Sequence, residues 1–246
     1  MYKDPFFFVQ CFFSSTLTIV VWGFLGKWLA GDTLHNASLQ VAMFLSFVSW
    51  ELMQRSYFDI SGRFQDEIND GNIINIFASP LQLLEYLFGL LLLACINLST
   101  IISIIFFVAF CFYDIALWRA DPKIIPFMGV MVFSGLSMGL CGASFLITTG
   151  KKFYGIIFIM IRSFAPLSGA FYPVTVLPKP LLFIARILPF GYATEGIRVV
   201  MLHGTFDWYL FIVSITLSFV CFACATYLFF WSFLRSKERG LARLND

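Results

Sequence analysis

The chain has 246 residues, of which 60% are hydrophobic, 19% are aromatic and only 12% are charged. Soluble domains carry about 25% charged residues, so this composition excludes an ordinary soluble protein and predicts an all-α membrane protein. The formal net charge of +2 is too small to indicate a protein that binds nucleic acid.

A helix needs about 20 apolar residues to cross the hydrocarbon core of a bilayer. Six stretches meet this requirement: residues 6–28, 39–60, 83–112, 124–148, 153–172 and 208–234. With six spans, both termini lie on one side of the membrane. The short segments on that side hold more lysine and arginine than the short loops opposite, so the positive-inside rule places both termini in the cytoplasm. The residues counted are Lys3, Arg63, Lys151, Lys152, Arg235, Lys237, Arg239 and Arg243 inside, against Lys27, Arg119 and Lys123 outside.

The second span carries charged residues within its apolar sequence. Glu51, Arg55 and Asp59 follow one another at four-residue spacing and therefore share one face of a helix. One interpretation is a polar lining of a substrate path, or a gate held by Glu51 and Arg55. The alternative is a helix that continues into the cytoplasm as a stalk with exposed ion pairs, and this alternative is favoured for Asp59. Because a charge at the centre of a span is unfavourable in lipid, Arg162 in the fifth span is expected to face the bundle, where it pairs with Glu51 or caps broken-helix carbonyls.

Two segments between spans have their own predicted structure. Residues 61–80 combine charges with apolar residues at helical spacing, which predicts a short amphipathic cytoplasmic helix over about 62–79, ended by Ser79 and Pro80. Residues 173–207 are apolar but interrupted by Pro173, Pro178, Pro180 and Pro189. The pieces are too short to cross, so they predict a re-entrant exterior hairpin, buried in protein to satisfy its backbone.

Small residues four apart allow close contact between helices in lipid. Gly135-x-x-x-Gly139 in span four and Ala165-x-x-x-Gly169 in span five have this spacing, which indicates internal packing or a dimer seam.

No motif for catalysis or metal binding occurs in the sequence. It contains no G-x-x-x-x-G-K-[ST] to hold ATP and no G-x-S-x-G elbow, so we expect neither an ATPase nor a hydrolase. The two histidines, His35 and His203, are too few for a histidine metal site. The six cysteines lie inside apolar runs, where they behave as small apolar residues: Cys11, Cys95, Cys111, Cys141, Cys221 and Cys224.

Two local patterns, in this order along six spans, resemble the type-2 ATP-binding-cassette (ABC) exporter permease family. The first is Glu67-x-x-x-Gly71, followed by Ile76-Phe77-Ala78-Ser79-Pro80 and then Glu85 and Gly89. The second is Ser168-Gly169-Ala170-Phe171-Tyr172-Pro173, followed by Leu177-Pro178, Leu188-Pro189, Tyr192-Ala193, Glu195 and Arg198. Family members usually carry an amphipathic connecting helix before the first span. Here only four residues precede Pro5, so either this branch lacks that helix or the chain begins late.

The resemblance implies a permease subunit in a bacterial cytoplasmic (inner) membrane, paired with a second copy or a paralogue and with a separate ABC ATPase that holds ATP and Mg. It implies outward movement of a hydrophobic or amphipathic substrate: a drug, a lipid-like molecule or a glycoconjugate. The implied contacts with the ATPase are Glu67, Gly71, Ile74, Phe77, Ser79 and Pro80. The implied exterior hairpin residues are Gly169, Tyr172, Pro173, Pro178, Pro189, Tyr192, Glu195 and Arg198.

Two other functions fit the composition. One is a stand-alone secondary transporter that couples an ion through Glu51, Arg55 and Arg162. The other is an intramembrane enzyme or assembly factor that depends on the same charged residues.

Overall fold

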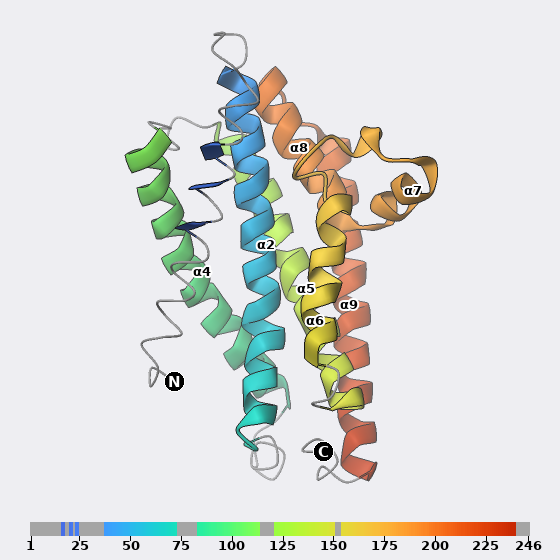
Figure 1. Ribbon diagram of the computed structural model, residues 1–246. Helices are drawn as coiled ribbons and strands as arrows, with labels where there is room; N and C mark the ends of the chain where they lie inside the picture. The colour runs from blue at the N-terminus through green and yellow to red at the C-terminus, as the bar shows by residue number, and fades with distance from the viewer. Residues whose placement is uncertain are drawn as a thin grey trace.

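The computed structural model describes residues 37–72, 83–113, 121–150 and 154–239, together with isolated positions between 16 and 24. Within these ranges the regular elements are α-helices and short 3-10 turns, as expected for an all-α membrane protein (Figure 1). The predicted first span, residues 6–28, lies largely outside the described residues. The helices are α2 (Ala37–Asn69), α4 (Leu83–Tyr113), α5 (Ile125–Thr149), α6 (Tyr154–Phe164), α7 (Lys179–Ile187), α8 (Pro189–His203) and α9 (Trp208–Arg239).

Three described helical segments are long and apolar enough to cross a membrane: Glu85–Phe107, Pro122–Thr149 and Trp208–Ser236. They confirm the third, fourth and sixth predicted spans. The 33-residue helix α2 is also long enough, at about 1.5 Å per residue, but it carries the charged residues of the second span.

The predicted fifth span is wrong in its exterior part. Helix α6 ends at Phe164 and passes into a 3-10 turn at Ala165–Leu167, because Pro166 lacks the amide hydrogen that would continue the helix. The apolar helical segment Gly155–Leu167 is therefore only about 20 Å long, shorter than the roughly 30 Å hydrocarbon core.

The predicted boundary between span two and a separate cytoplasmic helix is also wrong. Residues 61–69 continue α2 without a break. The helix ends where the amide of Gly71 donates to the carbonyl of Ile68, with Gly71 in the left-handed region at φ 70°. The rest of the predicted helix, including Ile74, Phe77, Ser79 and Pro80, lies outside the described residues.

A seam of glycines joins α5 to α2. A β-carbon added to Gly139 would lie 2.8 Å from the carbonyl oxygen of Tyr57, and one on Gly135 would overlap the carbonyl oxygen of Met53. A β-carbon on Gly142 would lie 3.0 Å from the hydroxyl of Tyr57. The Gly135-x-x-x-Gly139 pattern therefore serves packing within one protomer. Ala165 and Gly169 do not form such a pattern, since Gly169 lies beyond the end of the helix.

Helix α5 packs on its other side against α9, and α8 contacts α2, α5 and α9. Figure 1 shows α7 and α8 at one end of the bundle and the C-terminal ends of α2 and α9 at the other. This arrangement agrees with the predicted separation of the exterior hairpin from the cytoplasmic segment after span two.

Candidate functional site

The turn that follows α6 is built around a serine and a glycine. The Ser168 hydroxyl donates to the carbonyl of Ala165 at 2.7 Å and accepts from the amide of Ala170 at 3.1 Å. Gly169 has φ +72°, and a β-carbon there would lie 2.7 Å from Cγ2 of Val174. Both the backbone conformation and the space therefore require glycine at this position.

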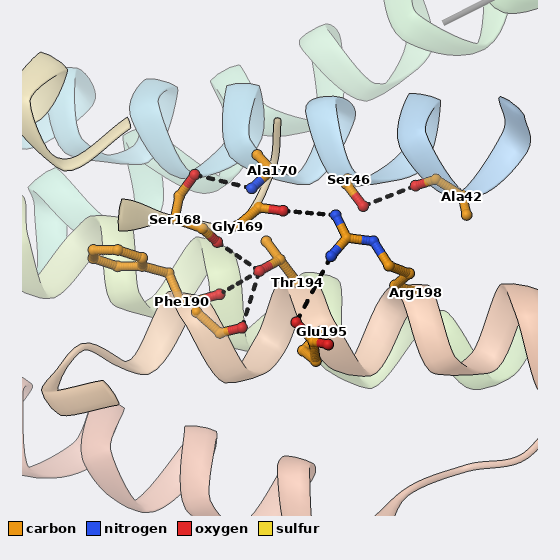
Figure 2. Close-up of polar contacts among 10 residues, drawn as sticks. Ala42, Ser46, Ser168, Gly169, Ala170, Phe190, Thr194, Glu195 and Arg198 are labelled. Carbon is orange, nitrogen blue, oxygen red and sulfur yellow. Dashed lines mark hydrogen bonds and ion pairs between the residues drawn. The ribbon is translucent and has the colours of Figure 1, made fainter. Parts of the chain in front are cut away.

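Helix α8 holds this turn through two polar side chains, which Figure 2 shows pointing at its carbonyl groups. The Thr194 hydroxyl lies 2.6 Å from the carbonyl oxygen of Ser168, its closest acceptor. The Arg198 guanidinium donates to the carbonyl of Gly169 at 2.8 Å, and its other terminal nitrogen lies 3.7 Å from the Glu195 carboxylate. Arg198 is only 7% exposed, so its charge depends on these two partners.

The structure thus brings together Gly169, Glu195 and Arg198, three of the predicted hairpin residues. It adds Ser168 and Thr194, which were not among the predicted site residues. Thr194 lies four residues before Arg198, and this spacing on an apolar helix is the signal that two polar groups face the same target.

The other predicted hairpin residues shape the chain around this network. The Tyr172 hydroxyl donates to the carbonyl of Pro166 at 2.9 Å and closes the turn. Pro173, Pro178 and Pro189 precede or begin the helical pieces. At these positions the backbone amide has no acceptor within the helix, so the amide hydrogen that proline lacks is not missed. Tyr192 is half-buried on α8 and takes no part in the network.

The hairpin was predicted to be buried in protein, and only its second helix, α8, is buried in this way. Phe190 and Ile197 of α8 are fully buried, and the ring of Phe190 packs against Trp50. Phe183 of α7, by contrast, is 69% exposed. Burial of α7 is not needed because its backbone groups bond to one another within the helix, and exposed apolar side chains suit lipid.

The C-terminal end of α8 is tied to the start of α5. The Lys123 ammonium donates to the carbonyl of Gly204 at 2.8 Å and lies 3.1 Å from the Asp121 carboxylate. The hydrogen bond from the backbone amide of Lys123, helped by its ammonium, lowers the pKa of Asp121 below the usual aspartate value.

Asp59 is not part of an exposed pair, so the favoured stalk interpretation is wrong for this residue. Its side chain is 8% exposed and accepts a hydrogen bond of 2.7 Å from the Asn97 amide on α4. Asn97 lies in the middle of an apolar sequence, and it is the donor that α4 presents to α2 at this level. Glu51 and Arg55 are half-buried, and both take part in interactions.

Arg162 does not face the other described helices of its protomer. The positions of α6 that do so are Ile157 and Ile161, both fully buried, and Arg162 follows Ile161 about 100° around the helix. Its side chain is exposed, and no hydrogen bond or ion pair within the described ranges reaches it. The three predicted path residues therefore do not meet in one hydrogen-bonded cluster.

At the opposite end of the bundle, α2 ends in an acidic segment. Glu67 is half-buried there, two turns beyond Asp59, and Gly71 ends the helix. Partial burial and the carboxylates of Asp70 and Glu67 raise the pKa of Asp66, and Arg63 opposes this shift.

Across the described part of the chain, no group of three or more His, Cys, Asp and Glu side chains is arranged to hold a metal ion. Several hydroxyl groups in the bundle are instead hydrogen-bonded to backbone carbonyls or to one another. An example is the pair Ser134 and Ser218, whose hydroxyls lie 2.9 Å apart between α5 and α9.

Residues 1–202 match the family model described as ABC-2 type transporter. The match covers most of the chain, so the chain belongs to the ABC-2 type transporter family of membrane permeases. A comparison with curated proteins finds no match.

Proposed function

We propose that this chain is the permease subunit of an ABC exporter, which moves a hydrophobic or amphipathic substrate outward across a bacterial inner membrane. A separate ABC ATPase would hydrolyse ATP with Mg, because the sequence contains no P-loop. The observation that carries the proposal is the family match over residues 1–202, together with the buried Gly169–Arg198 contact formed by the family's second pattern.

In this proposal the ATPase acts on the segment after α2. The contact would be formed by Glu67, Gly71, Ile74, Phe77, Ser79 and Pro80. Carboxylates in this segment would fix its register on the ATPase, and its apolar side would dock against the ATPase surface. The left-handed Gly71 supports this role because it lets the chain leave α2 sharply.

The exterior hairpin would form the exit of a path between two permease copies, either identical or paralogous. Its network of Ser168, Gly169, Thr194, Glu195 and Arg198 supports this role, because it couples the end of α6 rigidly to α8. A displacement of α6 would therefore move α8 as well.

A stand-alone ion-coupled transporter is less well supported. That function requires Glu51, Arg55 and Arg162 to form one ion site, and Arg162 is exposed on α6 with no partner within the described residues.

The test is purification of the tagged chain from its native membranes, with co-purifying proteins identified by mass spectrometry. We expect a P-loop ATPase whose ATP hydrolysis is inhibited by vanadate. In the reconstituted complex, Gly71→Ala should lower stimulated ATP hydrolysis severalfold, whereas Gly71→Asn should largely preserve it, because asparagine tolerates the left-handed region.

Gly62→Ala is the matched control, since Gly62 lies in the middle of helical α2 and a β-carbon there meets nothing within 4 Å. Substrate transport by the purified chain without any nucleotide-binding partner would refute the proposal.

A further inference from the structure

Only one side of helix α6 is covered by the described bundle. It touches α2 where the Tyr57 hydroxyl donates to the carbonyl of Ile157 at 3.0 Å and where the Phe58 and Phe158 rings lie 5.0 Å apart. The opposite side, which includes Ile159, Arg162 and Ser163, is exposed. Among the described residues of this protomer, none covers that side.

The depth of Arg162 follows from the contacts of Tyr57. The same hydroxyl that reaches Ile157 lies 3.0 Å from the β-carbon position of Gly142, so Ile157 and Gly142 are at a similar level. Arg162 lies five residues further along α6, about 7.5 Å toward the exterior. Because α5 runs in the opposite direction, this level corresponds to about residue 137, close to the middle of the span Pro122–Thr149.

An arginine at this depth cannot be left in lipid at low cost. A charged side chain at the centre of a span costs about 2.5–3.5 kcal/mol on insertion scales and almost always faces a bundle or a water-filled cavity. Snorkelling relieves this cost only near helix ends, and here each interface is about 15 Å away. The side of α6 that carries Arg162 therefore faces water or protein.

The charge of Arg162 has no counter-ion on its own helix. The described residues around it on the exposed side, at positions 155, 158, 159, 163 and 166, include no acid. On α2, the register through Tyr57 puts Glu51 at a similar level, but no ion pair joins Glu51 to Arg162 among the described residues. Two copies facing one another would thus bring two uncompensated guanidinium groups to a shared path.

We infer that Arg162 lines a water-filled path between two permease copies and binds the anionic group of an amphipathic substrate. This inference rests on the proposed function and names its substrate class. Guanidinium suits the task because it stays charged and offers a planar pair of donors to phosphate, sulfate or carboxylate. The apolar part of the same molecule would lie against neighbours such as Phe158 and Ile159.

The test uses the permease with its ATPase in nanodiscs, and three twelve-carbon amphipaths as probes. These carry a phosphate, a phosphocholine or a trimethylammonium headgroup. We expect dodecyl phosphate to stimulate ATP hydrolysis at the lowest concentration. Arg162→Gln should raise its half-stimulating concentration about tenfold without affecting the cationic probe, Arg162→Lys should retain most of the preference, and Arg162→Glu should reverse it.

Arg235→Gln is the matched control, because Arg235 is an exposed arginine near the C-terminal end of α9, outside both α6 and the exterior hairpin. This control variant should leave both basal ATP hydrolysis and the headgroup preference unchanged. A complex that is stimulated equally by the three probes, or an Arg162→Gln variant that keeps the anion preference, overturns this inference while leaving the permease function intact. Absence of any nucleotide-dependent activity is instead a failure of the proposed function.

Two further measurements separate a substrate site from an ion pair between copies. Arg162→Cys should be modified by a water-soluble methanethiosulfonate reagent above the background of the unsubstituted chain, whereas Phe219→Cys on the exposed side of α9 should not. Lack of modification at position 162 contradicts a water-filled path. Full rescue of Arg162→Glu by Glu51→Arg would show that these residues pair with each other, and would also overturn the inference.

Discussion

Replacement of Gly169 by alanine tests whether the turn after α6 is held as tightly as its contacts indicate. Alanine in the left-handed region costs about 1–2 kcal/mol. The added β-carbon also meets Cγ2 of Val174 at 2.7 Å and the Thr194 hydroxyl at 2.9 Å, and such overpacking costs about 1–3 kcal/mol more. We therefore expect Gly169→Ala to lower the free energy of unfolding by about 2–5 kcal/mol.

The chain offers a matched control for this variant. Gly204 has nearly the same φ, +68° against +72°, but a β-carbon there meets nothing within 4 Å. Gly204→Ala should therefore show only the conformational cost of about 1–2 kcal/mol.

The assay is unfolding of each purified variant in nanodiscs, followed by tryptophan fluorescence at one scan rate. Val174→Ala should recover part of the loss in the Gly169→Ala background, because it removes the closest clashing atom. Equal destabilisation by the two glycine variants, with no coupling to Val174, would refute the argument that α8 and the turn leave no space.

Four further predictions follow from contacts described above. Arg198→Ala should lower the free energy of unfolding by about 1–3 kcal/mol, because it leaves the buried Gly169 carbonyl without its donor and the half-buried Glu195 without its cation, whereas Arg186→Ala should change it by less than about 0.5 kcal/mol. Asn97→Leu should cost about 1–3 kcal/mol by leaving Asp59 without its donor, and a double replacement by leucine that recovers nothing would contradict this pairing. Gly139→Leu should prevent assembly of α2 with α5 and reduce folded protein in membranes, while Gly129→Leu, which has open space on the same helix, should be tolerated. The pKa of Asp121 is lowered in the folded chain, so its ionised carboxylate stabilises the fold. This contribution to the free energy of unfolding should be present above the usual aspartate pKa of 3.8 and be lost as pH falls through the lower folded pKa. Asp121→Asn should remove this acid sensitivity when unfolding is measured from about pH 5 to about pH 2.

The lengths of the apolar stretches predicted much of the fold, because every span must be long enough to cross the same hydrocarbon core. It located the three apolar membrane-spanning helices to within a few residues. It was wrong for the fifth span, where apolar sequence continues past Phe164 but Pro166 ends the helix. Hydropathy cannot separate a span from a turn made of the same apolar residues.

Polar contacts between helices were much harder to predict than the spans. The sequence singled out Gly169, Glu195 and Arg198, and they meet in the structure. The partner of Asp59 is a lone asparagine 38 residues away, and no local pattern connects the two. The direction of Arg162 depends on which side of α6 touches α2, and only tertiary packing decides that.

The glycine seam between α2 and α5 has a mechanical consequence. Backbone atoms of the two helices meet at Gly135 and Gly139 without side chains that could change rotamer, so the pair resists sliding and should move as one lever. The exterior end of that lever carries Phe127, whose ring occupies the space left by the missing β-carbon of Gly196 on α8. A push near Gly71 would thus reach the exterior hairpin as a rigid displacement.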